Sequence, residues 1–129
     1  MTPPQIPVLL LASRDQQLAY LIQRYADTCG CQLIQAETGA GILNVIAQSR
    51  PNVILLDVSQ ANVEGQQALR DIKSAESSRL IPVILCGTSE TDWLDCEAEG
   101  RLLQPILLND FAHVLSETGL QIPKNVKEV

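Results

Sequence analysis

One carboxylate in the sequence stands where a reacting group would be placed by an α/β fold. Asp57 follows the apolar run NVILL at residues 52–56 and precedes a polar loop that ends at Gly65. A carboxylate can act as a nucleophile toward phosphoryl groups when its surroundings neutralise the incoming charge. The sequence therefore leaves two interpretations of Asp57 open, a phosphoacceptor or a solvated acid at the end of a strand that accepts hydrogen bonds from loop amides.

Other residue types that carry chemistry lack the required spacing. The four cysteines do not form a Cys-x-x-Cys pair, and the single histidine, His113, lies far from a partner motif, so we expect reduced, mostly buried thiols and a surface histidine. The segment TGAGILN (38–44) imitates a dinucleotide fingerprint but has Asn44 at the third glycine position. These patterns argue against metal, redox and nucleotide sites.

The elements that must position Asp57 are five short strands alternating with helices. Apolar runs without alternation predict buried strands, here at residues 7–12, 31–36, 52–57, 81–86 and 101–103. Helical spacing predicts five helices, at about residues 13–30, 39–48, 64–75, 92–98 and 108–117. Right-handed crossovers then place helices on both faces of a parallel sheet, which predicts a three-layer α/β/α sandwich.

Length and charge limit the class of protein. With 129 residues, the chain fits a single domain over residues 1–120, followed by a flexible tail or linker stub at 121–129. A net charge of -6 and the lack of a Lys/Arg cluster argue against nucleic-acid and membrane partners. Because the amino-terminal segment does not resemble a signal peptide, we expect a cytoplasmic protein.

The spacing of the strand ends resembles that of receiver domains in two-component response regulators. The segments RPNVILLD (50–57) and ILLDVSQANVEG (54–65) are similar to the phosphoacceptor strand of that family and the loop after it. The resemblance covers about residues 7–118 and implies a flavodoxin-like, five-stranded parallel sheet of order 2-1-3-4-5. It also implies that Asp57 stands at the phosphoacceptor position.

The remaining motif positions of the family depart from its pattern. The adjacent acids that hold Mg²⁺ correspond to Ala12 and Ser13, and a methyl group and one hydroxyl cannot replace two carboxylates. The Ser or Thr at the end of the fourth strand corresponds to Gly87, and the lysine before the fifth-strand proline corresponds to Gln104. The aromatic switch position is Arg101.

These departures predict a pseudo-receiver that acts in signalling through phosphorylation-independent protein–protein interaction. We expect no enzymatic activity and no cofactor, and a partner that is another signalling protein or output domain. The alternative is a conventional receiver, part of a phosphorelay, that accepts a phosphoryl group on Asp57 from a histidine kinase with the help of Mg²⁺. A flavodoxin-like enzyme is disfavoured, because the strand ends offer no base, metal cluster or phosphate loop.

The partner surface is expected on the face that the family builds from its fourth helix, fifth strand and fifth helix. Trp93, Arg101 and Phe111 are its candidates, because aromatic and arginine side chains are enriched in binding hot spots. For Trp93, packing inside the domain is an equally good interpretation. Periodicity also leaves open whether Leu107, Leu108, Phe111 and Leu115 of the last helix cover the sheet or extend the partner surface. The sequence also leaves a homodimer through the last helix open.

Overall fold

The protein forms a parallel sheet of five strands in the order β2-β1-β3-β4-β5. The structure is a computed structural model and describes residues 6–39, 41–59, 64–94 and 96–120. The elements in chain order are β1 Val8–Ala12, α1 Gln16–Cys29, β2 Gln32–Ala36, α2 Ile42–Ser49, β3 Val53–Asp57, α3 Gly65–Ser74, β4 Val83–Gly87, the 3-10 helix η1 Glu90–Trp93, β5 Gly100–Leu103 and α4 Leu108–Glu117.

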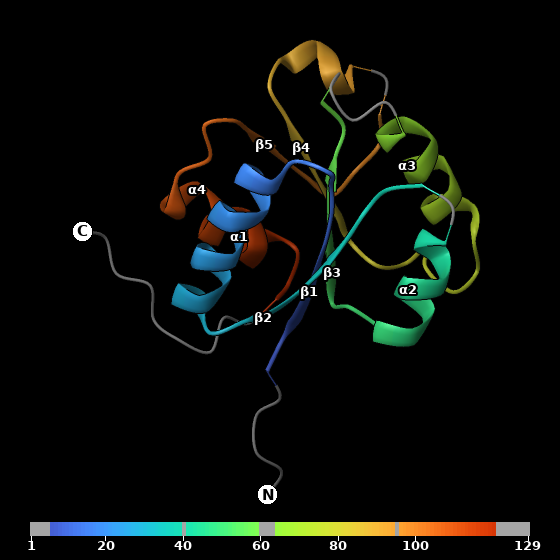
Figure 1. The fold of residues 1–129 in the computed structure, drawn as a ribbon, viewed down its shortest axis with the longest axis horizontal. Coiled ribbons are helices and arrows are strands. Elements are labelled where there is room, and N and C mark those ends of the chain that lie inside the picture. Colours follow the sequence, from blue (N-terminus) through green and yellow to red (C-terminus); the bar gives the residue numbers. More distant parts are fainter. Residues whose placement is uncertain (1–5, 40, 60–63, 95, 121–129) are drawn as a thin grey trace, which may run out of the picture.

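The sheet is covered by helices on both faces. Helices α1 and α4 lie on one face and α2 and α3 on the other (Figure 1). Each face carries its own aliphatic core: Leu9, Leu11 and Ile84 point toward α1 and α4, whereas Leu10 and Leu56 point toward α2 and α3. The predicted three-layer sandwich and strand order 2-1-3-4-5 are confirmed.

Local sequence explains where α1 begins and ends. Asp15 is its N-cap, and its carboxylate accepts hydrogen bonds from the amides of Gln17 at 2.9 Å and Leu18 at 3.2 Å. Gly30 ends the helix in the left-handed conformation, with a φ of 77°. The cap brings the chain from β1 directly into the helix, so the residues between them stay at the edge of the sheet.

The prediction of a helix at residues 92–98 is wrong. Among the described residues of this stretch, the 3-10 turn Glu90–Trp93 forms instead, because the Asp92 side chain accepts hydrogen bonds from the amides of Thr88 and Ser89 and closes a tight turn. The described regions therefore contain four α-helices and one 3-10 helix instead of five helices.

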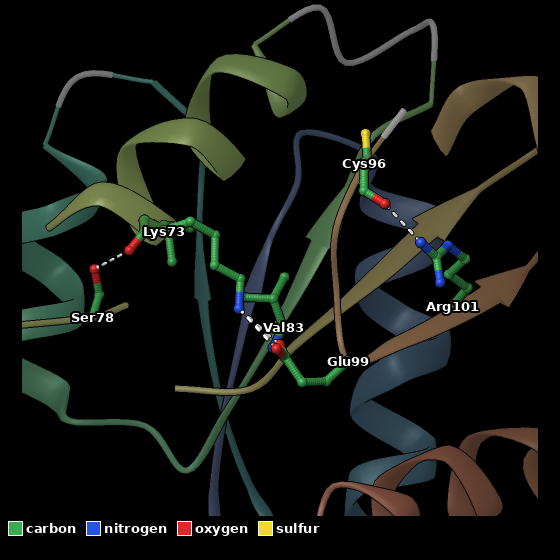
Figure 2. Close-up of polar contacts among 7 residues, drawn as sticks. Lys73, Ser78, Val83, Cys96, Glu99 and Arg101 are labelled. Atoms are coloured by element: carbon green, nitrogen blue, oxygen red, sulfur yellow. Dashed lines mark hydrogen bonds and ion pairs between the residues drawn. The ribbon is translucent and has the colours of Figure 1, made fainter. Parts of the chain in front are cut away.

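The chain after η1 is held as an extended segment. Glu99 accepts a hydrogen bond from the Val83 amide at 2.7 Å and pairs with Lys73 of α3 at 2.8 Å (Figure 2). Arg101 donates to the carbonyl oxygen of Cys96 at 2.7 Å, as Figure 2 also shows. These contacts join the segment to α3, β4 and β5 and leave no length for another helix.

Two further expectations concern the ends and the surroundings of the domain. The tail predicted at residues 121–129 lies outside the described residues. Among the described parts of the chain, no helix has the length and apolar character needed to cross a membrane.

Candidate functional site at the carboxyl ends of the strands

Asp57 closes β3 and is buried, with 2% of its surface exposed. Its Oδ2 accepts a hydrogen bond from the Ser13 hydroxyl at 2.6 Å. Its Oδ1 accepts from the amide of Ser59 at 3.0 Å and from the Ser59 hydroxyl at 2.7 Å. Asp57 is therefore not a solvated acid, but it does accept a hydrogen bond from the loop amide of Ser59, as the second interpretation expected.

Pairing between β1 and β3 brings Ser13 to this acid. Ala12 lies opposite Leu56 in the parallel register, so the next residue of each strand meets at the same edge of the sheet. The Ser13 hydroxyl also accepts from the Asp15 amide at 2.9 Å, which orients it toward Asp57. Ala12 is fully buried in the apolar core beneath the site and offers no ligand atom.

Gly65 allows α3 to begin directly against the strand end. A Cβ atom at Gly65 would lie 2.2 Å from the Asp57 carbonyl oxygen and 3.0 Å from Val58 Cα. Backbone atoms cannot give way as a flexible side chain does, so this position requires glycine for space. The close approach places the first turn of α3 against the backbone of Asp57 and Val58.

Arg14 joins the loops around the site. Its guanidinium pairs with Glu64 at 3.1 Å and with Glu37 at 3.8 Å, and the Arg14 side chain is 56% exposed. Such exposed pairs contribute little to stability individually. Their effect here is to direct the cation toward two glutamates at the rim.

At the end of β4, where the receiver pattern has a Ser or Thr hydroxyl, the indole ring of Trp93 lies against Gly87. A Cβ atom at Gly87 would lie 2.8 Å from Cζ3 and 3.0 Å from Cε3 of Trp93. Cys86, which lies opposite Asp57 in the sheet, is fully buried. Burial raises the pKa of its thiol to about 12, and the negative charge of Asp57 adds to the effect. This thiol is therefore inert at neutral pH.

Gln104 follows β5 at the same edge of the sheet. Its backbone amide donates to the Gly87 carbonyl oxygen at 2.8 Å, and its peptide bond to Pro105 is cis. The side chain is half-buried and carries no charge. The structure thus gathers Asp57, Ser13, Gly87 and Gln104 at one edge, as parallel strands require.

The residues at this edge do not fit a magnesium site. Mg²⁺ favours octahedral oxygen ligands that include carboxylates, and Asp57 is the carboxylate that β1, β3 and β4 contribute here. Its oxygens are already bound by Ser13 and Ser59. Within residues 6–39, 41–59, 64–94 and 96–120, no group of three or more His, Cys, Asp or Glu side chains is arranged to hold a metal ion.

The three candidates for the partner surface lie in different environments. Phe111 is 0% exposed and packs against Tyr25 with ring centroids 5.6 Å apart, so its assignment to the partner surface is wrong. Its position in α4 faces the sheet, which periodicity alone could not decide. Trp93 is half-buried against the α2–α3 side of the sheet, and Arg101 is exposed.

Sequence reasoning missed the role of Ser59 and the contact between Trp93 and Gly87. The signal for Ser59 was present, because a serine two residues after an aspartate can bond its side chain. No pattern in the sequence predicts the contact between Trp93 and Gly87. The two residues are six positions apart, and the turn after β4 brings them together.

Several known proteins resemble this chain in sequence. The chain is 30% identical over 115 residues to the autoinducer 1 sensor kinase/phosphatase LuxN of Vibrio harveyi, covering 86% of this chain and 13% of that protein. It is 34% identical over 86 residues to protein PilG of Pseudomonas aeruginosa, covering 64% of this chain and 62% of that protein. The chain thus spans less than two thirds of these curated relatives. No family model matches it.

Solved structures share the fold at lower identity. The receiver domain of sensor histidine kinase PA1611 from Pseudomonas aeruginosa, described with magnesium coordinated in its active-site cleft, matches with a TM-score of 0.78 and 17% identity over 90% of this chain and 100% of that chain. The chemotaxis response regulator CheY4 of Vibrio cholerae matches with a TM-score of 0.76 and 15% identity over 88% of this chain and 99% of that chain. The structure matches show that this chain has the fold of response-regulator receiver domains.

Proposed function

We propose that this chain is a pseudo-receiver domain, which acts in signal transduction through protein–protein interaction that does not depend on phosphorylation. The observation that carries the proposal is the environment of Asp57, whose two oxygens are bound by Ser13 and Ser59. In this role, Asp57 joins the ends of β1 and β3 and does not react. The protein then has no catalytic activity and requires no Mg²⁺.

The electrostatics of the site support this role. Phosphoryl transfer to a carboxylate depends on cations that neutralise charge on the equatorial oxygens. Here Gln104 stands where receivers carry a lysine, and Ser13 stands where they carry an acid that holds the metal. Loss of one preorganised electrostatic group typically costs about 10²- to 10³-fold in rate, so loss of two leaves transfer to Asp57 extremely slow.

Exposed apolar side chains in the segments after η1, in β5 and before α4 support the interaction role. Leu94 after η1, Leu103 in β5 and Leu107 before α4 are 73%, 45% and 61% exposed. The neighbouring Glu90 and Glu97 are exposed, and the chain has a net charge of -6. A signalling protein or output domain in the cytoplasm that presents apolar side chains flanked by lysine or arginine would complement this surface.

Titration with peptides of defined charge tests the chemistry of this surface. An amphipathic peptide of leucine and lysine should shift the amide NMR signals of Leu94, Leu103 and Leu107, and the matched peptide of leucine and glutamate should not. Leu103→Ser should weaken the response. Equal shifts with both peptides would contradict the charge complementarity, and concentration-dependent shifts without any peptide would indicate that a second copy binds there.

The state of Asp57 is tested with beryllofluoride, which mimics an aspartyl-phosphate. Amide NMR spectra would be recorded with Mg²⁺ and then beryllofluoride, for the natural protein and for Asp57→Asn. We expect no shift centred on Asp57, Gly87 or Gln104. Shifts that appear in the natural protein and vanish in Asp57→Asn would overturn the proposal and identify a receiver that a histidine kinase can phosphorylate.

A further inference from the structure

The ring of Trp93 occupies the space next to the end of β4. Its Cζ3 and Cε3 atoms lie 2.8 Å and 3.0 Å from the position of a Cβ atom at Gly87, and Asp92 Oδ2 lies 3.1 Å from it. Observed Cβ contacts essentially never fall below 3.0 Å, so any larger residue at this position must displace the indole. A serine or threonine hydroxyl at Gly87 is therefore incompatible with this position of Trp93.

Gly87 is needed for space and not for backbone conformation. It is absent from the residues with positive φ, among which the described glycines are Gly30, Gly39, Gly41 and Gly119. An alanine at Gly87 would meet no backbone penalty. Its cost would come entirely from the contact with Trp93 and Asp92, which makes the contact measurable by substitution.

Hydrogen bonds hold the turn that carries Trp93. The buried carboxylate of Asp92 accepts from the amides of Thr88 at 2.9 Å and Ser89 at 3.1 Å. Gln66 of α3 donates to the Asp92 carbonyl oxygen at 2.6 Å, which joins η1 to the neighbouring helix. The indole itself packs against the apolar core on the α2–α3 side. The ring is therefore fixed from both the turn and the core.

We propose that Gly87 and Trp93 form a steric lock that holds the turn after β4 in a single conformation. The indole fills the space in which a receiver would place its switching hydroxyl, so that Leu94, which follows Trp93, is displayed on the surface at all times. The inference rests on the proposed function and deepens it, because it supplies the physical reason for an interaction surface without a switch.

A double-mutant cycle in urea tests the contact. Gly87→Ala should lower the equilibrium constant of folding by about 5- to 150-fold, the range typical of one overpacked methyl group. In the Trp93→Leu background the same change should cost several-fold less, because the smaller side chain leaves room for the methyl group and only the contact with Asp92 at 3.1 Å remains. An equal penalty in both backgrounds would overturn the lock.

Gly100 provides a matched control for the cycle. A Cβ atom there would lie 2.7 Å from Val114 and 3.3 Å from Ile84, which belong to the core on the α1–α4 face, whereas Trp93 packs against the core on the other face. Gly100→Ala should therefore carry the same penalty with and without Trp93. If Trp93→Leu does not fold, Trp93→Phe replaces it. We then expect the Gly87→Ala penalty to be partly relieved, and an unchanged penalty would contradict the lock.

Relaxation dispersion of backbone amides tests the single conformation. Residues 88–94 should show no microsecond-to-millisecond exchange in the natural protein, and exchange should appear there in Trp93→Leu but not in α1. Exchange in the natural protein would overturn the lock. Beryllofluoride binding with an intact double-mutant cycle would overturn the proposed function alone, so the two failures are distinguishable.

Discussion

The hydroxyl of Ser13 lies 2.6 Å from Oδ2 of Asp57 and joins two strands whose residues are 44 positions apart in the sequence. In a receiver that binds Mg²⁺, an acid stands at the position of Ser13 and is bridged to the phosphoacceptor by the metal. Here a neutral donor bonds the carboxylate directly and joins the two strand ends.

Removing this donor should destabilise the domain. Ser13→Ala deletes a hydrogen bond to a buried charged group, which typically costs about 1–3 kcal/mol. Urea denaturation followed by circular dichroism measures the loss. Ser116→Ala is a control, because its exposed hydroxyl bonds only the His113 carbonyl oxygen among the interactions described, and it should change stability by less than about 0.5 kcal/mol. Equal effects of the two changes would contradict a supporting role for Ser13.

A carboxylate at this position should create a response to Mg²⁺. Ser13→Asp places a second negative charge beside Asp57, so we expect a lower melting temperature without metal. Mg²⁺ at 100 times its dissociation constant would restore about 2.7 kcal/mol through binding to the folded state alone. Ser13→Asn is the uncharged control. If Mg²⁺ raises the melting temperature of the natural protein as much as that of Ser13→Asp, the natural site binds the metal.

Gly65→Ala should be among the most damaging single changes. Its Cβ atom would lie 2.2 Å from the Asp57 carbonyl oxygen, which must move together with β3 or α3. We expect a loss of about 3 kcal/mol or more, at the upper end of overpacking effects. Gly119→Ala meets open space but a φ of 89°, so its cost should stay near about 1–2 kcal/mol. A milder effect at Gly65 than at Gly119 would show that α3 shifts without strain.

The contact between Glu99 and Lys73 should make stability depend on pH. Partial burial alone would raise the pKa of the Glu99 carboxyl, but the hydrogen bonds from Lys73 and the Val83 amide and the charge of Lys73 outweigh burial and hold it below its ordinary value of 4.5. A lowered pKa in the folded state stabilises the protein above pH 4.5, and this contribution is lost as the pH falls through the lowered value.

Glu99→Gln measures this contribution. Because the Glu99 side chain is 45% exposed, solvent screening limits the loss to about 1 kcal/mol at neutral pH. The difference from the natural protein should shrink as the pH falls below 4.5 in urea denaturation series. Glu117→Gln, which removes the exposed pair with His113, should have a smaller effect. A pH-independent difference for Glu99→Gln would exclude a role for its ionisation.

Cysteine labelling should be confined to one residue in the folded protein. Cys29, Cys31 and Cys86 are buried, and burial raises the pKa of Cys31 to about 11, with a further contribution from Cys29. Cys96 is half-buried and donates weakly to Gln66 at 3.1 Å. Mass spectrometry after brief iodoacetamide treatment should find Cys96 modified, and all four thiols after unfolding. Rapid labelling of Cys86 would show that the sheet opens beside Asp57.

The sequence by itself determined the sheet and the place of Asp57 within it. The short apolar runs at residues 7–12, 52–57 and 81–86 predicted buried strands, and parallel strands bring their carboxyl ends to one edge. Helix α4 has the predicted bounds Leu108–Glu117, because its apolar residues recur at helical spacing. From their residue types alone, Ser13 and Gln104 also indicated that this edge lacks the acid and the lysine of the receiver pattern.

Only the tertiary structure decided how that edge is arranged. Periodicity shows that a helix has an apolar side but not what covers it, so the sequence left Phe111 a candidate for the partner surface or for the core, and the structure places it in the core. The hydrogen bond from Ser13 to Asp57 and the contact of Trp93 with Gly87 depend on how strands and turns pack. Such contacts join residues that one-dimensional patterns treat separately, and their energies emerge only when the chain has folded.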